Sequence, residues 1–220
     1  MDLEEIWRLR EEEVYPRLFG PVGRGIFPLT QDLFARCFGQ HDLDPRWLFF
    51  GVFEFPPTAS RNSWTYVTSG YSNPWEVEPG AYDPDGGSGS GVEFTLAVSE
   101  QGDWAIETLQ AMLAFDLLLG AGRFPNGRPL SIHDRIPLRA PINGNPDCKI
   151  RNLVVVEHED GPKRFSLPSG KVTLVGFTGV TDAELAFAKS AGSPALIDRL
   201  RDIGCHPITN PNRESLFEQA

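Results

Sequence analysis

The stretch SGSGVEFTLAVSEQGDWAIETLQAMLAFDLLLGAGRFPNGRPL, residues 88–130, decides the fold. Residues 92–98 alternate large apolar with polar or small side chains, which predicts a strand buried on one face. After a break at Gln101-Gly102, we expect the carboxylate of Asp103 to cap a helix over residues 104–119. Apolar residues recur in this helix at three- and four-residue spacing, namely Ile106, Leu109, Leu113 and Leu117, with Met112, Phe115 and Leu118 beside them. A helix with so little polar surface must pack against a sheet or within a core.

Strands are predicted on both sides of this stretch. Aromatic and β-branched residues are concentrated over residues 47–55 and again over residues 64–68. Between these strands and residue 92 lies a loop, residues 72–91, which is rich in Pro and Gly. Further along the chain we expect a strand over residues 153–156 and a hairpin of residues 165–167 and 172–177. Residues 136–138 have only a weak strand pattern.

Helices are predicted at both ends of the chain. The first covers residues 2–15 and ends at Pro16, with water-facing glutamates at positions 4, 5, 11, 12 and 13. Thr30 should cap a short helix that ends at Phe38. Thr181 and Glu184 form a capping box, and Ser193-Pro194 should supply the cap and first residue of a last helix.

The pattern predicts an α/β (α+β) fold in which helices pack on a mixed β-sheet. No Pro/Ser linker separates two hydrophobic cores. We therefore expect residues 1–44 to form a helical extension that packs on one domain of residues 45–220.

The order of several short motifs resembles the suppressor-of-fused (SUFU) domain. WTYVTSG at residues 64–70 is followed by GSGVEFTL at residues 89–96, and then by Asp103-Trp104 and its apolar helix. Further matching segments are IRNLVV at 150–155, GKVTLV at 170–175, VTDAEL at 180–185, ITN at 208–210 and RESLF at 213–217. The resemblance covers roughly residues 45–218 and depends on the order and spacing of the motifs. It implies a fold like the N-terminal domain of that family, with Glu93 in a structural role as an acceptor of backbone or hydroxyl hydrogen bonds.

Composition and charge exclude several functions. The net charge of −10 argues against nucleic acid as a partner, because a phosphate-backbone binder needs an excess of Lys and Arg. The sequence has no apolar run of about 18 residues, so we expect no membrane span. Three widely spaced cysteines and an acidic start without a signal peptide indicate a reducing compartment, and we predict a cytoplasmic protein.

The search for catalytic and ligand motifs is negative. The glycines at positions 87, 89 and 91 precede a strand, whereas a nucleotide loop needs them to open a helix. The segment around Lys171 lacks the Walker spacing, and no G-x-S-x-G is present. The four histidines and three cysteines have no metal-ligand spacing. The prediction is therefore no catalytic residues, no metal site and no cofactor.

Two groups of residues are candidates for partner binding. Trp75, Tyr82, Asp83 and Asp85 lie in the long loop, where aromatic and acidic side chains occur together. Glu157, Glu159 and Asp160 follow the strand of residues 153–156. Each acidic cluster has a simpler interpretation as a solvated turn.

The resemblance implies a protein-binding module without enzymatic activity. In animals, SUFU proteins restrain Gli-type transcription factors by holding a peptide between this domain and a second one, which we expect to be missing from a chain that ends at Ala220. The single-domain form resembles the bacterial branch, which implies an immunity protein that neutralises a nearby-encoded polymorphic toxin by stoichiometric binding. We expect a monomer or weak homodimer. The alternative is a small enzyme with its site between the 72–91 loop and the carboxylates after residue 156.

Overall fold

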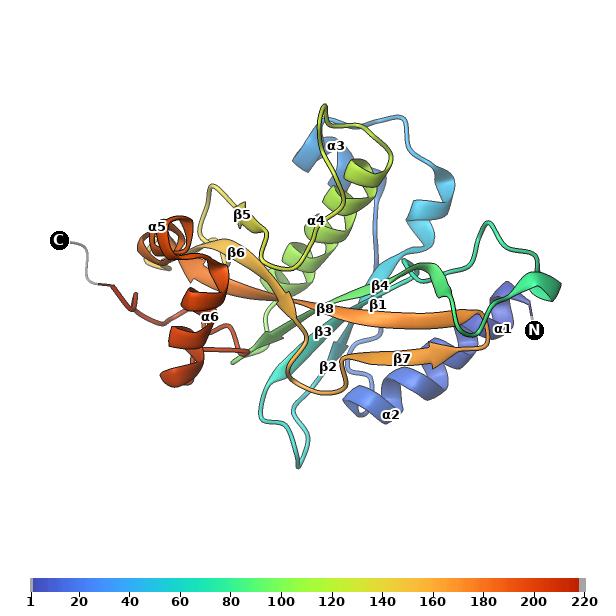
Figure 1. Ribbon diagram of the computed structural model, residues 1–220, viewed down its shortest axis with the longest axis horizontal. Helices are drawn as coiled ribbons and strands as arrows, with labels where there is room; N and C mark the ends of the chain where they lie inside the picture. The colour runs from blue at the N-terminus through green and yellow to red at the C-terminus, as the bar shows by residue number, and fades with distance from the viewer. Residues whose placement is uncertain (1, 218–220) are drawn as a thin grey trace.

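The fold is one eight-stranded mixed sheet with helices on both faces (Figure 1), seen in a computed structural model that describes residues 2–217. The strand order is β1-β2-β3-β4-β8-β6-β5, with β7 beside β8. The pairing of β4 with β8 is parallel and the other pairings are antiparallel. The strands are β1 (Ile26–Pro28), β2 (Gly51–Phe55), β3 (Trp64–Ser69), β4 (Gly87–Val98), β5 (Arg135–Pro137), β6 (Ile150–Glu157), β7 (Arg164–Leu167) and β8 (Gly170–Thr181). This confirms the predicted fold class.

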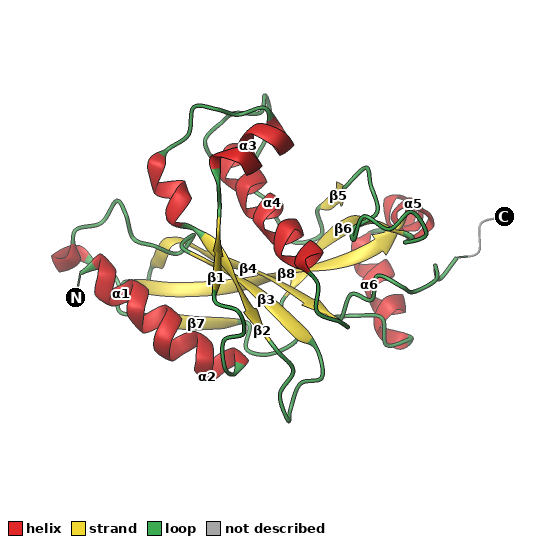
Figure 2. Cartoon of the chain, turned by 180° about the vertical axis from the view of Figure 1, so that it is seen from behind, coloured by secondary structure: helices red, strands yellow, loops and turns green. Residues whose placement is uncertain are grey.

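The helices divide between the two faces of the sheet. Helix α4 (Asp103–Gly120) crosses one face, with α3 (Gln31–Phe38) above it. The other face is covered at one end by α1 (Leu3–Arg8), the π-helical turn η1 (Leu9–Val14) and α2 (Tyr15–Phe19), which run on from one another (Figure 2). At the other end it is covered by α5 (Asp182–Ala191) and α6 (Ser193–Asp202). Among the described residues no helix is both long and apolar enough to cross a membrane.

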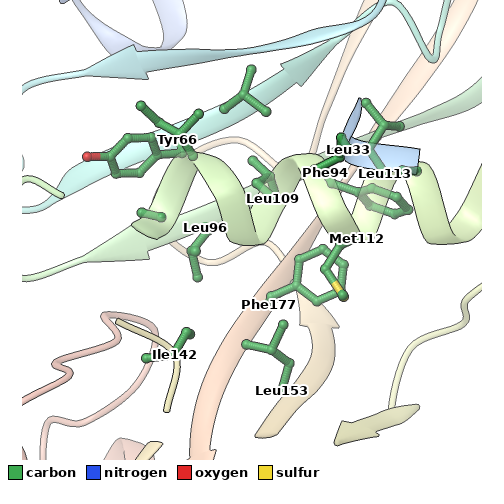
Figure 3. Close-up of a cluster of buried hydrophobic side chains, with 14 of the residues drawn as sticks. Leu33, Tyr66, Phe94, Leu96, Leu109, Met112, Leu113, Ile142, Leu153 and Phe177 are labelled. Carbon is green, nitrogen blue, oxygen red and sulfur yellow. The ribbon is translucent and has the colours of Figure 1, made fainter. Parts of the chain in front are cut away.

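The largest hydrophobic core lies between α4 and the sheet, as the sequence predicts. Leu109 and Leu113 are fully buried there, and Ile106 and Leu117 are nearly so. The ring of Phe94 from β4 meets that of Phe177 from β8 at a centroid distance of 5.3 Å beneath the helix (Figure 3). The alternation of β4 sends Phe94 to this face and Glu93 to the opposite one.

Two predicted helix caps are wrong. Gly102 occupies the N-cap position of α4, and Asp103 is its first helical residue. Its carboxylate accepts a hydrogen bond from Arg24 Nη1 at 2.7 Å instead. Gly192 likewise caps α6, and the Ser193 hydroxyl donates to the His133 carbonyl. In both cases a tertiary partner binds the side chain that the local pattern assigned to the cap. The caps at Thr30 and at Thr181 with Glu184 are confirmed.

Three element boundaries also differ from the prediction. The first helical segment continues past Pro16 to Phe19, because this proline lies in the first turn of α2, where no amide donor is needed. Pro45–Phe49 form a 3-10 helix, η2, after an Asp44 cap, so β2 begins only at Gly51. Residues 87–91 open β4 and are not part of the loop; a second 3-10 turn, η3 (Pro79–Ala81), lies within the shortened loop.

The division into residues 1–44 and 45–220 stays a prediction. Within the first part, β1 pairs with β2 and extends the common sheet. Residues 1 and 218–220, at the ends of the two predicted parts, lie outside the described residues.

Candidate protein-binding surface

A buried polar network connects the N-terminal helices to the sheet. Glu93 accepts hydrogen bonds from the hydroxyls of Thr68 and Ser72, and from the backbone amides of Gly70 and Ser72, at 2.5–3.1 Å. This confirms its predicted structural role. The charge partner of this carboxylate is Arg10, a fully buried residue whose Nη1 lies 3.9 Å from Glu93 Oε1.

Arg10 also fixes the orientation of a neighbouring amide. Its Nη1 lies 2.6 Å from Asn73 Oδ1. A guanidinium can only donate, so the atom that faces it must be the oxygen of Asn73. The amide nitrogen Nδ2 therefore faces away from Arg10, and it has no hydrogen-bond partner.

Asn73 lies at the edge of an aromatic groove of about 250 Å³. We define the aromatic groove by its apolar lining residues, which are Trp47, Phe50, Tyr71, Pro74, Trp75, Val77 and Leu117. Helix α4 supplies Leu117, and the segments on either side of β2 and β3 supply the rings. Gly89 closes one side; it has a φ of +56°, and a Cβ there would lie 2.4 Å from the Asn73 carbonyl oxygen, so only glycine permits this close approach.

Exposed apolar side chains surround this groove. The ring of Phe49 is 53% exposed, and its centroid lies 6.1 Å from that of Trp75 and 6.1 Å from that of Trp7. Val77, which lines the groove, is 41% exposed. Four large apolar residues of the described chain are exposed, and two of them lie here. A local concentration of exposed apolar side chains is typical of an interaction surface.

Charged residues form the rim of the groove. The Arg46 guanidinium donates three hydrogen bonds to Asp44, at 2.6–3.1 Å, and also pairs with the more exposed Glu76. Hydrogen bonds from Arg46 hold the pKa of the Asp44 carboxyl below its usual value. Two carboxylates and one guanidinium leave this rim with a net negative charge.

A buried acid that was not among the predicted site residues holds Tyr71, one of the rings that line the groove. Asp116 Oδ2 accepts a hydrogen bond from the Tyr71 hydroxyl at 2.5 Å, and its Oδ1 accepts one from the Leu130 amide. Burial raises the pKa of the Asp116 carboxyl and raises the pKa of the Tyr71 hydroxyl. The sequence did carry a signal for this contact. Asp116 stands on an otherwise apolar helix face, and a buried carboxyl group needs a hydrogen-bond partner.

Two buried hydrogen-bond donors of the groove are unpaired. One is Asn73 Nδ2 and the other is Trp75 Nε1. Leaving a buried polar group without a partner costs about 1–3 kcal/mol. Both groups can only donate, so a molecule that satisfied them would have to offer acceptors.

The comparison with known families identifies the fold. The family model of the suppressor of fused protein (SUFU) matches residues 49–214, about three quarters of the chain. This chain belongs to the suppressor-of-fused family. A search of curated proteins found no match.

Solved SUFU structures share the fold. The chain matches one from a Sufu–Fu complex with a TM-score of 0.60 at 22% identity, covering 87% of this chain and 94% of that one. It matches Drosophila Suppressor of Fused with a TM-score of 0.58 at 22% identity, covering 86% of this chain but only 50% of the Drosophila chain. A SUFU homolog from Neisseria gonorrhoeae FA 1090 gives a TM-score of 0.54 at 17% identity, with 99% and 96% of the two chains covered.

The candidate residues of the long loop lie in different surroundings within this SUFU fold. Trp75 forms a wall of the aromatic groove. Tyr82 packs against the core on the opposite face of the sheet. Asp83 accepts a hydrogen bond from the Asp85 amide within a turn, and Asp85 pairs with Lys171 at 2.9 Å. The loop therefore contributes one ring to the groove and two carboxylates to an exposed turn.

The three carboxylates at the end of β6, of which Glu157 is the last residue of the strand, are each paired at a separate place. Glu157 pairs with Lys163. Glu159 pairs with Arg201 at 2.9 Å and lies 3.3 Å from His206 Nε2. Asp160 Oδ2 accepts a hydrogen bond from the Ser63 hydroxyl at 2.5 Å.

The structure does not bring the two acidic groups together. Asp85 contacts the start of β8 at Lys171, whereas Glu157 lies beside Val175 on the other side of that strand. Four residues of β-strand separate these positions by about 13 Å along β8. The loop and the β6 carboxylates therefore form two surfaces.

Two buried histidines lie near the β6 carboxylates. His158 Nδ1 is 2.9 Å from the Thr95 hydroxyl, and His206 Nδ1 is 2.8 Å from that of Thr178. Burial lowers the pKa of both imidazoles, although Asp160 and Glu159 respectively oppose the shift. Within residues 2–217 no group of three or more His, Cys, Asp or Glu side chains could hold a metal ion.

Proposed function

We propose that this SUFU-family chain is a non-enzymatic protein-binding module, and that it acts as an immunity protein which neutralises a bacterial toxin by stoichiometric binding. The observation that carries the proposal is the family match over residues 49–214. Two of the similar structures support it: one comes from a complex of Sufu with Fu, and another is a bacterial homolog that aligns with 99% of this chain. Binding requires only a complementary surface, and the aromatic groove offers one.

Charge supports a basic partner. The chain has 30 acidic and 20 basic residues, and a net charge of −10. The groove rim adds the exposed carboxylate of Glu76, and the turn before β4 adds those of Asp83 and Asp85. Opposite charge accelerates association between partners. A basic toxin domain encoded near this chain is therefore the partner that we propose.

The separation of the two acidic groups weighs against the enzymatic alternative. That hypothesis needs the long loop and the carboxylates after β6 to face one substrate, since catalytic groups act within hydrogen-bond reach of the reacting atoms. These groups lie on two surfaces, and Asp85, Glu157 and Glu159 are each paired with a cation. The pairs are typical of structural surface charges.

Co-expression tests the proposal. Each gene next to the one that encodes this chain would be expressed alone and together with the chain, and growth and complex formation would be measured. We expect one neighbour to be toxic alone, harmless with the chain, and recovered with it at one-to-one stoichiometry. If no toxic neighbour is rescued or bound, the immunity proposal is wrong.

A further inference from the structure

We propose that the aromatic groove binds one apolar side chain of a basic partner segment, and that main-chain carbonyls next to this side chain accept hydrogen bonds from Asn73 and Trp75. This inference rests on the proposed function, because it describes how a protein partner would be held. It adds the contact residues and the chemistry of the partner segment.

The size of the groove favours a side chain over a small-molecule ligand. Pockets for drug-sized ligands usually hold about 300–1,000 Å³. The groove holds about 250 Å³, and its walls are mostly aromatic rings. Exposed Phe49, next to Trp75, extends the apolar surface beyond the groove, where the rest of a partner segment would lie. This arrangement fits a single buried anchor surrounded by flatter contacts.

The two unpaired donors define what the segment must offer. Arg10 holds the oxygen side of the Asn73 amide, so the free group is a donor and cannot be exchanged for an acceptor by turning the amide. Trp75 Nε1 is also a donor only. An extended peptide can offer both, because its main-chain carbonyls are acceptors that lie next to the anchor side chain. A metal or organic cation alone would offer no acceptor to these two groups.

Trp75 must move for these donors to be reached. Both nitrogen atoms are covered, and the Trp75 ring is partly exposed. Its ring lies against Phe49 in a tilted contact at 6.1 Å and packs against the main core on the other side, so we infer that access requires the ring to swing outward past Phe49. Opening at Trp75 would admit the anchor and expose the Asn73 amide together.

The rim selects the charge of the segment. Asp44 and Glu76 outnumber Arg46 there, and Glu78 follows in the same loop. A lysine or arginine next to the anchor would meet a carboxylate at this rim, whereas an acidic segment would be repelled. Charge complementarity thus favours a basic partner segment.

The test uses blocked peptides and the complete chain. The probe is acetyl-Lys-Gly-Trp-Gly-Lys-amide; acetyl-Glu-Gly-Trp-Gly-Glu-amide tests the charge, and acetyl-Lys-Gly-Ala-Gly-Lys-amide tests the anchor. Peptides would be titrated to about 1 mM into 15N-labelled protein. The indole resonance of Trp75 would be assigned by its loss in Trp75→Phe. We expect the basic Trp peptide to shift this resonance and the Asn73 side-chain amide, and the other two peptides to bind at least about tenfold more weakly.

Two variants separate hydrogen bonding from shape. Trp75→Phe keeps an aromatic ring but removes the indole donor, and Asn73→Asp keeps an oxygen for Arg10 but replaces the free donor with an acceptor. Each variant should bind the basic Trp peptide at least about tenfold more weakly than the wild type does. The matched controls are Ile203→Ala, which truncates an exposed apolar residue elsewhere, and Glu107→Lys, which reverses an exposed charge on α4. Both controls should bind the probe like the wild type.

The possible failures are distinguishable. No shift with any peptide, or equal binding of all three, would overturn the groove inference. If the toxin neighbour still binds when the groove variants are introduced, the proposed function stands and the groove is not its interface. If the peptide binds but no toxin neighbour does, the groove inference stands without the immunity role.

Discussion

Arg10 connects three features at the scale of single residues. It is the charge partner of Glu93, it orients the Asn73 amide at the groove, and it joins the N-terminal helices to β3 through Ser69 at 3.1 Å. Arg10 was not predicted to be buried, because it precedes three glutamates of a helix whose charged residues were expected to face water. One of them, Glu11, was predicted to be exposed, but it is half-buried and accepts a hydrogen bond from the Ser69 hydroxyl at 2.5 Å.

Replacing Arg10 should destabilise the chain strongly. Arg10→Met leaves the buried Glu93 carboxylate without its cation, and breaking a buried ion pair in this way costs about 3–5 kcal/mol. The free energy of unfolding would be measured in urea. Arg8→Met, at an exposed position of the same helical segment, is the control and should change it by less than about 0.5 kcal/mol. Equal effects of the two changes would mean that the Arg10 network contributes no stability.

The buried histidines predict a dependence of stability on pH. The pKa values of His158 and His206 are lowered in the folded chain, mainly by burial. Between about pH 6.5, where a free histidine titrates, and these lower values, the unfolded chain binds more protons than the folded one. The contribution of these two neutral histidines to the free energy of unfolding should therefore be fully present above about pH 6.5, and it should be lost as the pH falls below that value. The urea midpoint at pH 7 and pH 5 measures this, and His158→Gln should reduce the difference; an equal or larger difference would contradict the assignment.

At the scale of elements, the apolar periodicity of the sequence predicted which segments form helices and strands that pack on a core. The residues at which these elements begin and end depend on tertiary contacts. The helix over 104–119, the strand over 153–156 and the hairpin at 165–177 were correctly located because their apolar patterns face a core. The strand expected over residues 47–55 lost its first part to the 3-10 helix η2, since Asp44 and Pro45 start a helical turn there. The aromatic residues at the start of this segment are as typical of a strand as of a groove lining, so composition did not show that Trp47 lines the aromatic groove.

The burial of α4 makes a quantitative prediction. Leu113 is fully buried between this helix and the sheet, so Leu113→Ala should lower the free energy of unfolding by about 2–5 kcal/mol. Glu107→Ala lies at an exposed position of the same helix and controls for helix propensity. Thermal or urea unfolding measures both. A loss below about 1 kcal/mol for Leu113→Ala would be incompatible with the close packing of the core.

At the scale of the whole molecule, the family could be predicted from the order of motifs, while the groove could not. The motifs are contiguous segments of sequence. The groove combines η2, the start of the long loop, the beginning of β4 and the end of α4, which are adjacent only in the folded chain. Of the seven partner-binding candidates, Trp75 alone lines it.

The exposed turn at Asp83 and Asp85 predicts an effect on association rate. Reversing both to Lys should slow association with a basic partner and flatten its salt dependence, because charges at the rim of an interface act mainly before contact. Dissociation should change little. Stopped-flow rates at several salt concentrations measure this, with Glu107→Lys as the control for an exposed charge on α4. Unchanged association would place the interface away from this turn.

A titration of toxin activity tests the central claim most directly. The activity of the neighbouring toxin would be measured against increasing amounts of this chain, at toxin concentrations well above the dissociation constant. Stoichiometric binding predicts a straight decline to zero at one chain per toxin, independent of incubation time. Complete, time-dependent loss of toxin activity at a small fraction of one equivalent would instead reveal turnover, and it would contradict the account of this protein as a binding module.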